Sequence, residues 1–236
     1  MDGDRISISP LALFDPLGTP RAPVVIDVRI DVYAQDDPHF LPTAWACPHL
    51  NIETELTEVM NKDVVVYCKG GLKLSMGAVA ILRSHNVRGR FLVGGQDGWR
   101  AEGLPLVSNT VIAGSNLIVL PDDPTPTELG TMWLIRRFIA PRSRIISGDR
   151  DHVSAIAEKF HGTAIKGDTC FDDAIARFSL ASPTLTALAQ RLMQNDARFV
   201  PLCHIIATGY VENTDRVAAA LSLFDTAFLY VRSTVK

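Results

Sequence analysis

The segment 64–75 constrains the fold of this chain most strongly, because an apolar run leads into a cysteine, then two glycines, then a helical pattern. Its three valines and Tyr67 predict a short buried strand that delivers Cys68 into a loop. The glycines allow a tight turn, and a helix is expected over residues 75–84, with Ser75 as its N-cap. The cysteine therefore lies between a strand end and a helix start.

A helix start favours negative charge, because free backbone N–H groups and the positive end of the helix dipole converge there. A sulfur held at that position is stabilised as a thiolate, the nucleophilic form of cysteine. Cys68 is therefore the candidate catalytic residue, although a small buried cysteine without chemistry is the common alternative. The predicted anion- and substrate-binding loop, whose lysines add cationic donors, consists of Lys69, Gly70, Gly71, Leu72, Lys73, Leu74 and Ser75.

Two further apolar runs, at residues 22–29 and 90–93, alternate with helical or loop segments. Alternating strands and helices predict an α/β fold with a mostly parallel sheet. Open sheets of this class carry their sites at the carboxyl ends of the strands, which is where Cys68 falls.

These segments resemble the rhodanese domain family over roughly residues 5–108. The resemblance rests on Ile-Asp-Val-Arg at 26–29, Val-Tyr-Cys at 66–68, Leu-Val-Gly-Gly-Gln-Asp-Gly-Trp at 92–99 and Gly-Leu-Pro at 103–105. It implies a rhodanese-like sulfurtransferase that needs no cofactor. Cys68 would take a sulfane sulfur from a small anion such as thiosulfate, hold it as a persulfide and pass it to a thiol or cyanide-like acceptor. Asp27 and Arg29 match the family's structural signature and would support the loop.

The chain also departs from the family pattern. The loop cations are lysines, and the family's Gly-His-Ile-Pro-Gly-Ala segment is replaced by residues 38–49. The loop is about one residue longer than usual, which resembles cell-cycle phosphatases and arsenate reductases. A Cys-x5-Arg phosphatase is disfavoured, because Leu74 stands where the arginine is required. An oxyanion (chromate or arsenate) reductase-like redox enzyme stays open, and so does a non-catalytic redox sensor or partner-binding protein.

The 236 residues, with 47% hydrophobic composition, predict two domains. A stretch rich in proline and aspartate at 120–127 suggests a rhodanese-like domain at 1–120 and a mostly α-helical domain at 121–236. Helices are expected at 128–139, 151–160, 170–178, 183–193 and 217–230.

The second half resembles the C-terminal domain of ChrB-type chromate-resistance proteins, through residues 132–141 and the Cys-Phe-Asp at 170–172. This resemblance implies a bacterial fusion protein linked to chromate, other oxyanions or thiol-redox stress. Arg136 and Arg137 are candidate oxyanion ligands, with ordinary surface ion pairs as the alternative. No metal site is expected, since no ligand spacing is recognised among His152, His161, Asp168, Cys170, Asp172 and His204.

Composition limits the remaining classes. A net charge of −3 without basic clusters argues against nucleic-acid binding. The acidic start is unlike a signal peptide, and the uncharged stretch 103–121 is too polar for a membrane span, so a cytoplasmic location is expected. Cys47 is a conceivable resolving thiol for Cys68, and the oligomeric state is not predicted.

Overall fold

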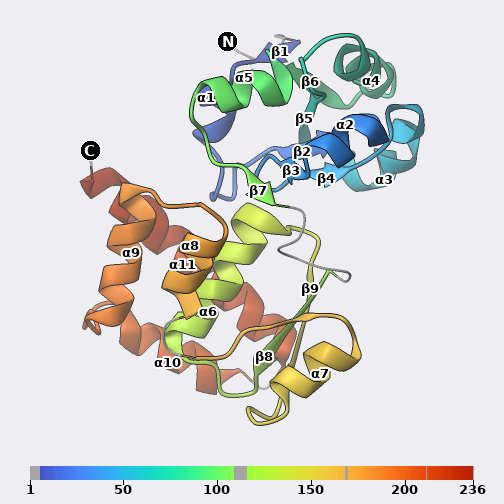
Figure 1. The fold of residues 1–236 in the computed structure, drawn as a ribbon. Coiled ribbons are helices and arrows are strands. Elements are labelled where there is room, and N and C mark those ends of the chain that lie inside the picture. Colours follow the sequence, from blue (N-terminus) through green and yellow to red (C-terminus); the bar gives the residue numbers. More distant parts are fainter. Residues whose placement is uncertain (1–5, 109–115, 168–169, 211, 236) are drawn as a thin grey trace. The chain divides into compact units, whose positions relative to one another are not determined.

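The computed structural model describes residues 6–108, 116–167, 170–210 and 212–235. The chain divides into two compact units, Met1–Asn109 and Thr110–Lys236, and each is treated by itself (Figure 1). Among the described residues, no helix combines the length and the apolar character needed to cross a membrane.

The first unit is built on a five-stranded sheet in which every strand pair is parallel. This confirms the predicted α/β fold with a mostly parallel sheet. In spatial order the strands are β1 (Ser7–Ile8), β6 (Arg88–Leu92), β5 (Asp63–Tyr67), β2 (Val24–Asp27) and β4 (Trp45–Ala46). A separate antiparallel pair joins β3 (His39–Phe40) to β7 (Val107–Ser108).

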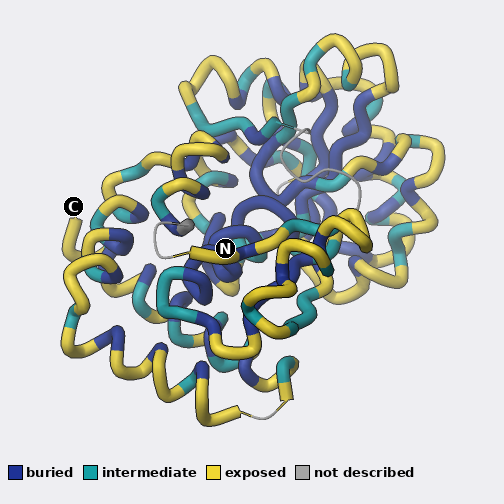
Figure 2. Tube along the Cα trace, turned by 60° about the horizontal axis from the view of Figure 1, so that its bottom comes forward, coloured by how far each residue is buried: buried dark blue, intermediate teal, exposed yellow. Residues whose placement is uncertain are grey.

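Helices cover both faces of this sheet, and each face has its own apolar core (Figures 1 and 2). On one face, α4 (Lys73–Ser84), α3 (Leu56–Val59) and the 3-10 helix η1 (His49–Glu55) pack on Ile26 and Val66. On the other face, α1 (Pro10–Phe14) and α5 (Gly95–Ala101) pack on Val25 and Val65. The short helix α2 (Asp31–Asp36) follows β2. The alternating valines of β2 and β5 supply both cores, because successive strand residues point to opposite faces.

Helix α4 begins earlier than the sequence pattern indicated. Its first residue is Lys73 and its N-cap is Leu72, so the prediction that Ser75 caps the helix is wrong. Gly71, at φ 67°, reverses the chain early enough for the helix to start two residues sooner. Ser75 is fully buried in the first turn, where its hydroxyl donates to the carbonyl of Leu72 at 3.0 Å.

The second unit contains a parallel three-stranded sheet in the order β10 (Thr163–Ala164), β8 (Leu117–Pro121) and β9 (Arg144–Gly148). Only helices were predicted in this half, so all three strands were missed. Strand β10 has only two residues, and β8 was considered only as part of a membrane-span candidate. The expected domain boundary at 120 also falls inside β8, whose hydrogen-bonded partners both belong to the second unit.

The predicted helical C-terminal region is confirmed. One helix, α10 (Val200–Gly209), was not predicted. The helix predicted at 128–139 is divided into α6 (Pro126–Leu134) and a π-helical turn, η3 (Ile135–Ile139). The aromatic core of the second unit centres on Trp133, which stacks on Phe224 with ring centroids 5.9 Å apart. The remaining helices of this unit are α7 (Val153–Lys159), α8 (Cys170–Arg177), α9 (Pro183–Met193) and α11 (Asn213–Thr234).

Candidate functional site

Cys68 lies at the carboxyl end of β5, near the middle of the first unit's sheet. The residue is 6% exposed, and its Sγ is 3.4 Å from the hydroxyl oxygen of Ser75 in the first turn of α4. The structure therefore brings together the predicted nucleophile and the last residue of the predicted loop.

The backbone of the loop packs directly against the turn that follows β6. Gly71 (φ 67°) and Gly95 (φ 56°) both adopt left-handed conformations. A Cβ on Gly95 would overlap the carbonyl oxygen of Cys68, and one on Gly71 would lie 2.5 Å from the nitrogen of Gly95. Only glycine fits these two positions, so the glycine pairs in the two sequence motifs serve one close backbone contact.

Two backbone hydrogen bonds join the same segments. The N–H of Gln96 donates to the carbonyl of Cys68, and the N–H of Asp97 donates to the carbonyl of Lys69, both at 3.0 Å. These donors come from the first turn of α5, which has N–H groups without helical acceptors. The start of α5 therefore fixes where the cysteine loop leaves the sheet.

A buried polar network holds this turn. Arg29 donates from Nε to both carboxylate oxygens of Asp27, at 3.0 and 2.8 Å, and from NH1 to Oε1 of Gln96 at 2.6 Å. Tyr67 donates its hydroxyl to Asp27 at 2.9 Å. Gln96 and Arg29 both donate to the carbonyl of His39, at 2.8 and 2.9 Å. Asp27 and Arg29 thus reach Cys68 through Gln96, as a loop-supporting role requires.

Burial and charge tune this network. Burial is the largest single influence on Arg29 and opposes its charge, but the hydrogen bond to Asp27 and the nearby negative charges together outweigh it, so the pKa of the guanidinium is raised. Burial, together with the nearby charge of Asp27, raises the pKa of Tyr67 well above its ordinary value. The phenol therefore stays a neutral donor. At the edge of the network burial opposes the charge of Asp37, yet hydrogen bonds from Arg100 and His39 lower the pKa of this carboxyl.

The outer part of the loop is open. Lys69, Gly70, Leu72 and Lys73 are exposed, Leu72 by 66%. The ammonium of Lys69 lies 5.0 Å from the ring centroid of Tyr33, a cation–π distance. In the described part of the chain, the backbone N–H groups of residues 69–72 donate to no protein acceptor. Unsatisfied N–H groups beside two lysines are suited to an anion.

Leu74 is not positioned to contact a ligand, because its partly buried side chain packs against the core on the α4 face. Cys47 lies in that same core. However, β2 runs between β4 and β5, so Cys47 and Cys68 follow strands two positions apart. Two inter-strand spacings are about 10 Å, whereas a disulfide requires Cα atoms within about 7 Å. A direct bond between these cysteines therefore needs backbone movement.

Those candidate residues of the second unit that the structure describes form no comparable site. Arg137 pairs with the buried carboxylate of Asp225 at 2.7 Å, and Arg136 donates to the carbonyl of Ser143 at 2.5 Å. Burial, with a smaller contribution from Arg137, lowers the pKa of Arg136. His152 pairs with Asp149 at 3.1 Å, and burial raises the pKa of Asp172.

The structure describes neither Asp168 nor the side chain of Cys170. His161 has partners of its own, and His204 is exposed on α10. Within the described ranges, no three acidic, histidine or cysteine side chains are grouped to hold a metal.

Sequence reasoning missed Gln96 and Tyr67 as functional residues. Both lie inside the motifs quoted for the rhodanese resemblance, and that was the available signal. Their contacts join residues 67 and 40 positions apart, so they became visible only in the folded unit.

Comparisons with known proteins assign this unit to a class. Residues 11–102 match the rhodanese-like domain family. The first unit is therefore a rhodanese-like domain, with the α/β fold of that family. No curated protein matches the chain.

Solved structures also resemble part of the chain. A rhodanese-related protein from Thermoplasma volcanium is 24% identical and covers 43% of this chain and 96% of its own, with a TM-score of 0.37. A rhodanese-like domain protein from Staphylococcus aureus is 24% identical over 39% of this chain and 89% of its own, with a TM-score of 0.36. A Rhodopseudomonas palustris protein described as of unknown function, a possible tyrosine phosphatase, is 18% identical over 43% and 84%, with a TM-score of 0.37.

Proposed function

We propose that the first unit is a sulfurtransferase that carries sulfane sulfur as a persulfide on Cys68. The observation that carries this proposal is the anchored loop: a cysteine at a strand end, 3.4 Å from Ser75, followed by N–H groups that have no acceptor among the described residues. A rhodanese-like domain at residues 11–102 supports the same class of activity.

The first half-reaction uses a small sulfur-donor anion such as thiosulfate. The Cys68 thiolate attacks the sulfane sulfur, a new S–S bond forms, and the S–S bond of thiosulfate breaks. Sulfite leaves with the electron pair of that bond. The loop N–H groups and the exposed Lys69 and Lys73 stabilise the donor's oxyanion and the resulting anionic persulfide.

The second half-reaction needs a thiophilic acceptor, either cyanide or a thiolate. The acceptor attacks the terminal sulfur of the persulfide, and the electron pair of the S–S bond returns to Cys68 as a thiolate. The product is thiocyanate when cyanide is the acceptor and a persulfide when a thiolate is the acceptor, so no external oxidant, reductant or cofactor is consumed.

Ser75 is a positioning residue in this scheme. Its hydroxyl donates to the carbonyl of Leu72, but it also lies within reach of the sulfur. Rotation of the hydroxyl would direct the proton to an anionic Sγ, because a hydroxyl rotor serves either acceptor. Ser75→Ala should therefore reduce the rate constant of sulfur loading more than it changes donor affinity.

The experiment is an intact-mass measurement after treatment with thiosulfate, followed by cyanide. We expect a gain of one sulfur that cyanide removes, with Cys68→Ser showing no gain. Cys47→Ser is the matched control, because this thiol is buried in the same core and should leave the gain intact. An unchanged mass, with Cys68 still open to alkylation, would exclude thiosulfate sulfurtransfer.

The structural arrangement gives less support to the other candidate functions. For a Cys-x5-Arg phosphatase this chain lacks the required arginine, because Leu74 occupies that position and packs inward. A reductase that relies on Cys47 must first move strands β4 and β5 together. The link to chromate or thiol-redox stress rests on the second unit's sequence resemblance alone. It is tested by following chromate reduction by the full chain with a thiol reductant, with Cys68→Ser as the control.

A further inference from the structure

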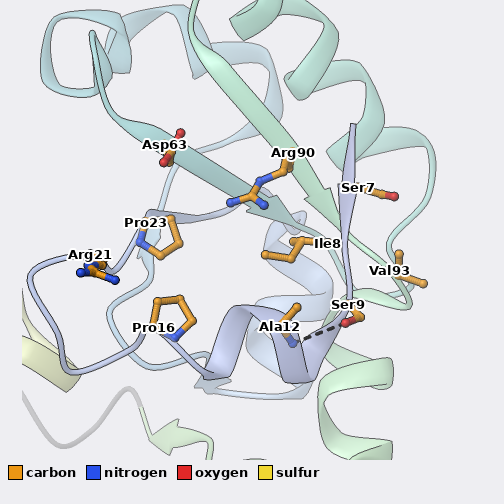
Figure 3. Close-up of a pocket in the computed structure, with 10 residues that line it drawn as sticks. All are labelled: Ser7, Ile8, Ser9, Ala12, Pro16, Arg21, Pro23, Asp63, Arg90 and Val93. Carbon is orange, nitrogen blue, oxygen red and sulfur yellow. Dashed lines mark hydrogen bonds between the residues drawn. The ribbon is translucent and has the colours of Figure 1, made fainter. Parts of the chain in front are cut away.

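A cavity of about 490 Å³ lies in the rhodanese-like unit, on the face of the sheet covered by α1 (Figure 3). Its walls are partly apolar, from Ile8, Pro16 and Pro23, and partly polar, from Ser7 and two arginines, Arg21 and Arg90. This size lies within the range of about 300–1,000 Å³ typical of small-molecule sites. Mixed apolar and polar walls are also typical of such sites.

Arg90 occupies an unusual place in this cavity. Successive residues of β6 face opposite sides of the sheet: Phe91 packs in the α4-side core and Leu92 in the α1-side core. Arg90 therefore shares the inward α1 side with Leu92, and its register partner on β5 is Val65. Figure 3 shows its guanidinium directed into the space between Pro23 and Ile8. An arginine on the core-facing side of a sheet is costly unless a partner compensates its charge.

Among the described residues, Arg90 has no such partner. In the part of the chain that the structure describes, the side chains of Arg90 and Arg21 make no hydrogen bond or ion pair. Asp63, an acidic residue of the wall, pairs with Arg88 at 2.7 Å. Two guanidinium groups, the half-buried one of Arg90 and the exposed one of Arg21, therefore line one cavity without an acceptor among the described residues, and an anion is the complementary ligand.

We propose that this cavity binds a small organic anion, with a phosphate or carboxylate head on Arg90 and Arg21 and an apolar body against Pro23, Ile8 and Pro16. The site differs from the sulfur-transfer loop, because Cys68 packs in the core on the opposite face of the sheet. None of the loop residues 69–75 lines the cavity. The proposal is thus independent of the chemistry of Cys68.

The test is equilibrium binding of phenyl phosphate to the full chain, by calorimetry, beside inorganic phosphate and phenol. The phosphate head and the phenyl body should both contribute to affinity, so phenyl phosphate should bind at least about tenfold more tightly than inorganic phosphate or phenol. Arg90→Gln should weaken it by about tenfold to a hundredfold, the loss expected for a charge-assisted hydrogen bond. Arg198→Gln is the matched control, because Arg198 is exposed and belongs to the second unit.

A second variant tests the location without changing charge. Ala12 is an exposed wall residue on α1, and Ala12→Leu should obstruct the cavity and weaken phenyl phosphate binding. Arg90→Gln should unfold at the same temperature as the wild type or higher, because it removes a half-buried charge that has no acceptor among the described residues. Unchanged affinity in both variants, no saturable binding, or a clear loss of stability in Arg90→Gln would overturn the proposal. The thiosulfate mass experiment uses no phenyl phosphate, so the two proposals fail separately.

Discussion

Contacts near the cysteine loop converge on Arg29. This side chain bonds the carboxylate of Asp27, the amide oxygen of Gln96 and the carbonyls of Asp37 and His39. Lysine keeps the charge but cannot reproduce the planar fork, so several buried acceptors would lose their donors. Arg29 therefore acts through geometry as much as through charge.

We expect Arg29→Lys to lower the free energy of unfolding by about 2–4 kcal/mol, the range for breaking a buried hydrogen-bonded pair. Arg88→Lys is the control, because the Arg88–Asp63 pair is exposed, with 68% of the Arg88 side chain accessible, and should change stability by less than about 0.5 kcal/mol. Urea unfolding measures both. Equal losses in the two variants would contradict the role assigned to Arg29.

Gly95 should tolerate no side chain. Its φ of 56° disfavours other residues, and an added Cβ would overlap the carbonyl oxygen of Cys68. Gly95→Ala should displace the loop and reduce sulfur loading on Cys68 by more than about tenfold. Gly103→Ala separates the two effects, because Gly103 has a similar φ of 66° but open space around it. This control should cost only about 1 kcal/mol of stability and leave loading intact. Loading is read by intact mass after thiosulfate.

Cys203 is expected to be chemically silent in the native protein. Burial in α10 raises the pKa of its thiol from 9.0 to about 12. Below pH 9 the folded thiol is therefore less ionised than the unfolded one by about a thousandfold. Only the thiolate is nucleophilic, so iodoacetamide at pH 8 should label Cys203 in urea but not in buffer. Rapid labelling of native Cys203, detected by peptide mass spectrometry, would show that the thiol is accessible.

At the scale of elements, a helix with a clear N-terminal signal in its sequence was predicted accurately. The 183–193 helix was predicted with the bounds that α9 shows, because Ser182 caps it and Pro183 fits its first turn. Helix α4 was placed two residues late, because the position of its start depends on the contact between Gly71 and Gly95. The strands β8, β9 and β10 were missed, because runs of two to five residues carry little periodicity of their own.

Helix α6 provides an element-scale prediction. Thr125 and Glu128 form a capping box, in which the Thr125 hydroxyl accepts from the N–H of Glu128 and the carboxylate accepts from the N–H of Thr125. Thr125→Ala should lower the free energy of unfolding by about 1 kcal/mol. Ser222→Ala, on the exposed side of α11, should stay within about 0.5 kcal/mol. Thermal unfolding followed by circular dichroism compares the two, and an equal effect would exclude the cap as a source of stability.

At the scale of the whole molecule, the two apolar clusters of the rhodanese-like domain contain only residues from its own unit. We therefore expect the fragment Met1–Asn109 to fold alone, with a cooperative thermal transition and sulfur loading on Cys68. Circular dichroism and intact mass provide the two readouts. A fragment without a cooperative transition would show that this domain depends on the rest of the chain.

The sequence by itself determined the class of this domain and indicated its candidate nucleophile, Cys68. Strand and helix periods depend on near neighbours, and the motifs around Asp27, Cys68 and Gly95 each lie within a few residues. Only the tertiary structure decided which residues hold the loop. The bond from Arg29 to Gln96 joins residues 67 positions apart. The parallel sheet also placed β2 between the two strands that Cys47 and Cys68 follow, and it left Arg90 facing a cavity. Such relations depend on strand order, and local sequence patterns do not encode strand order.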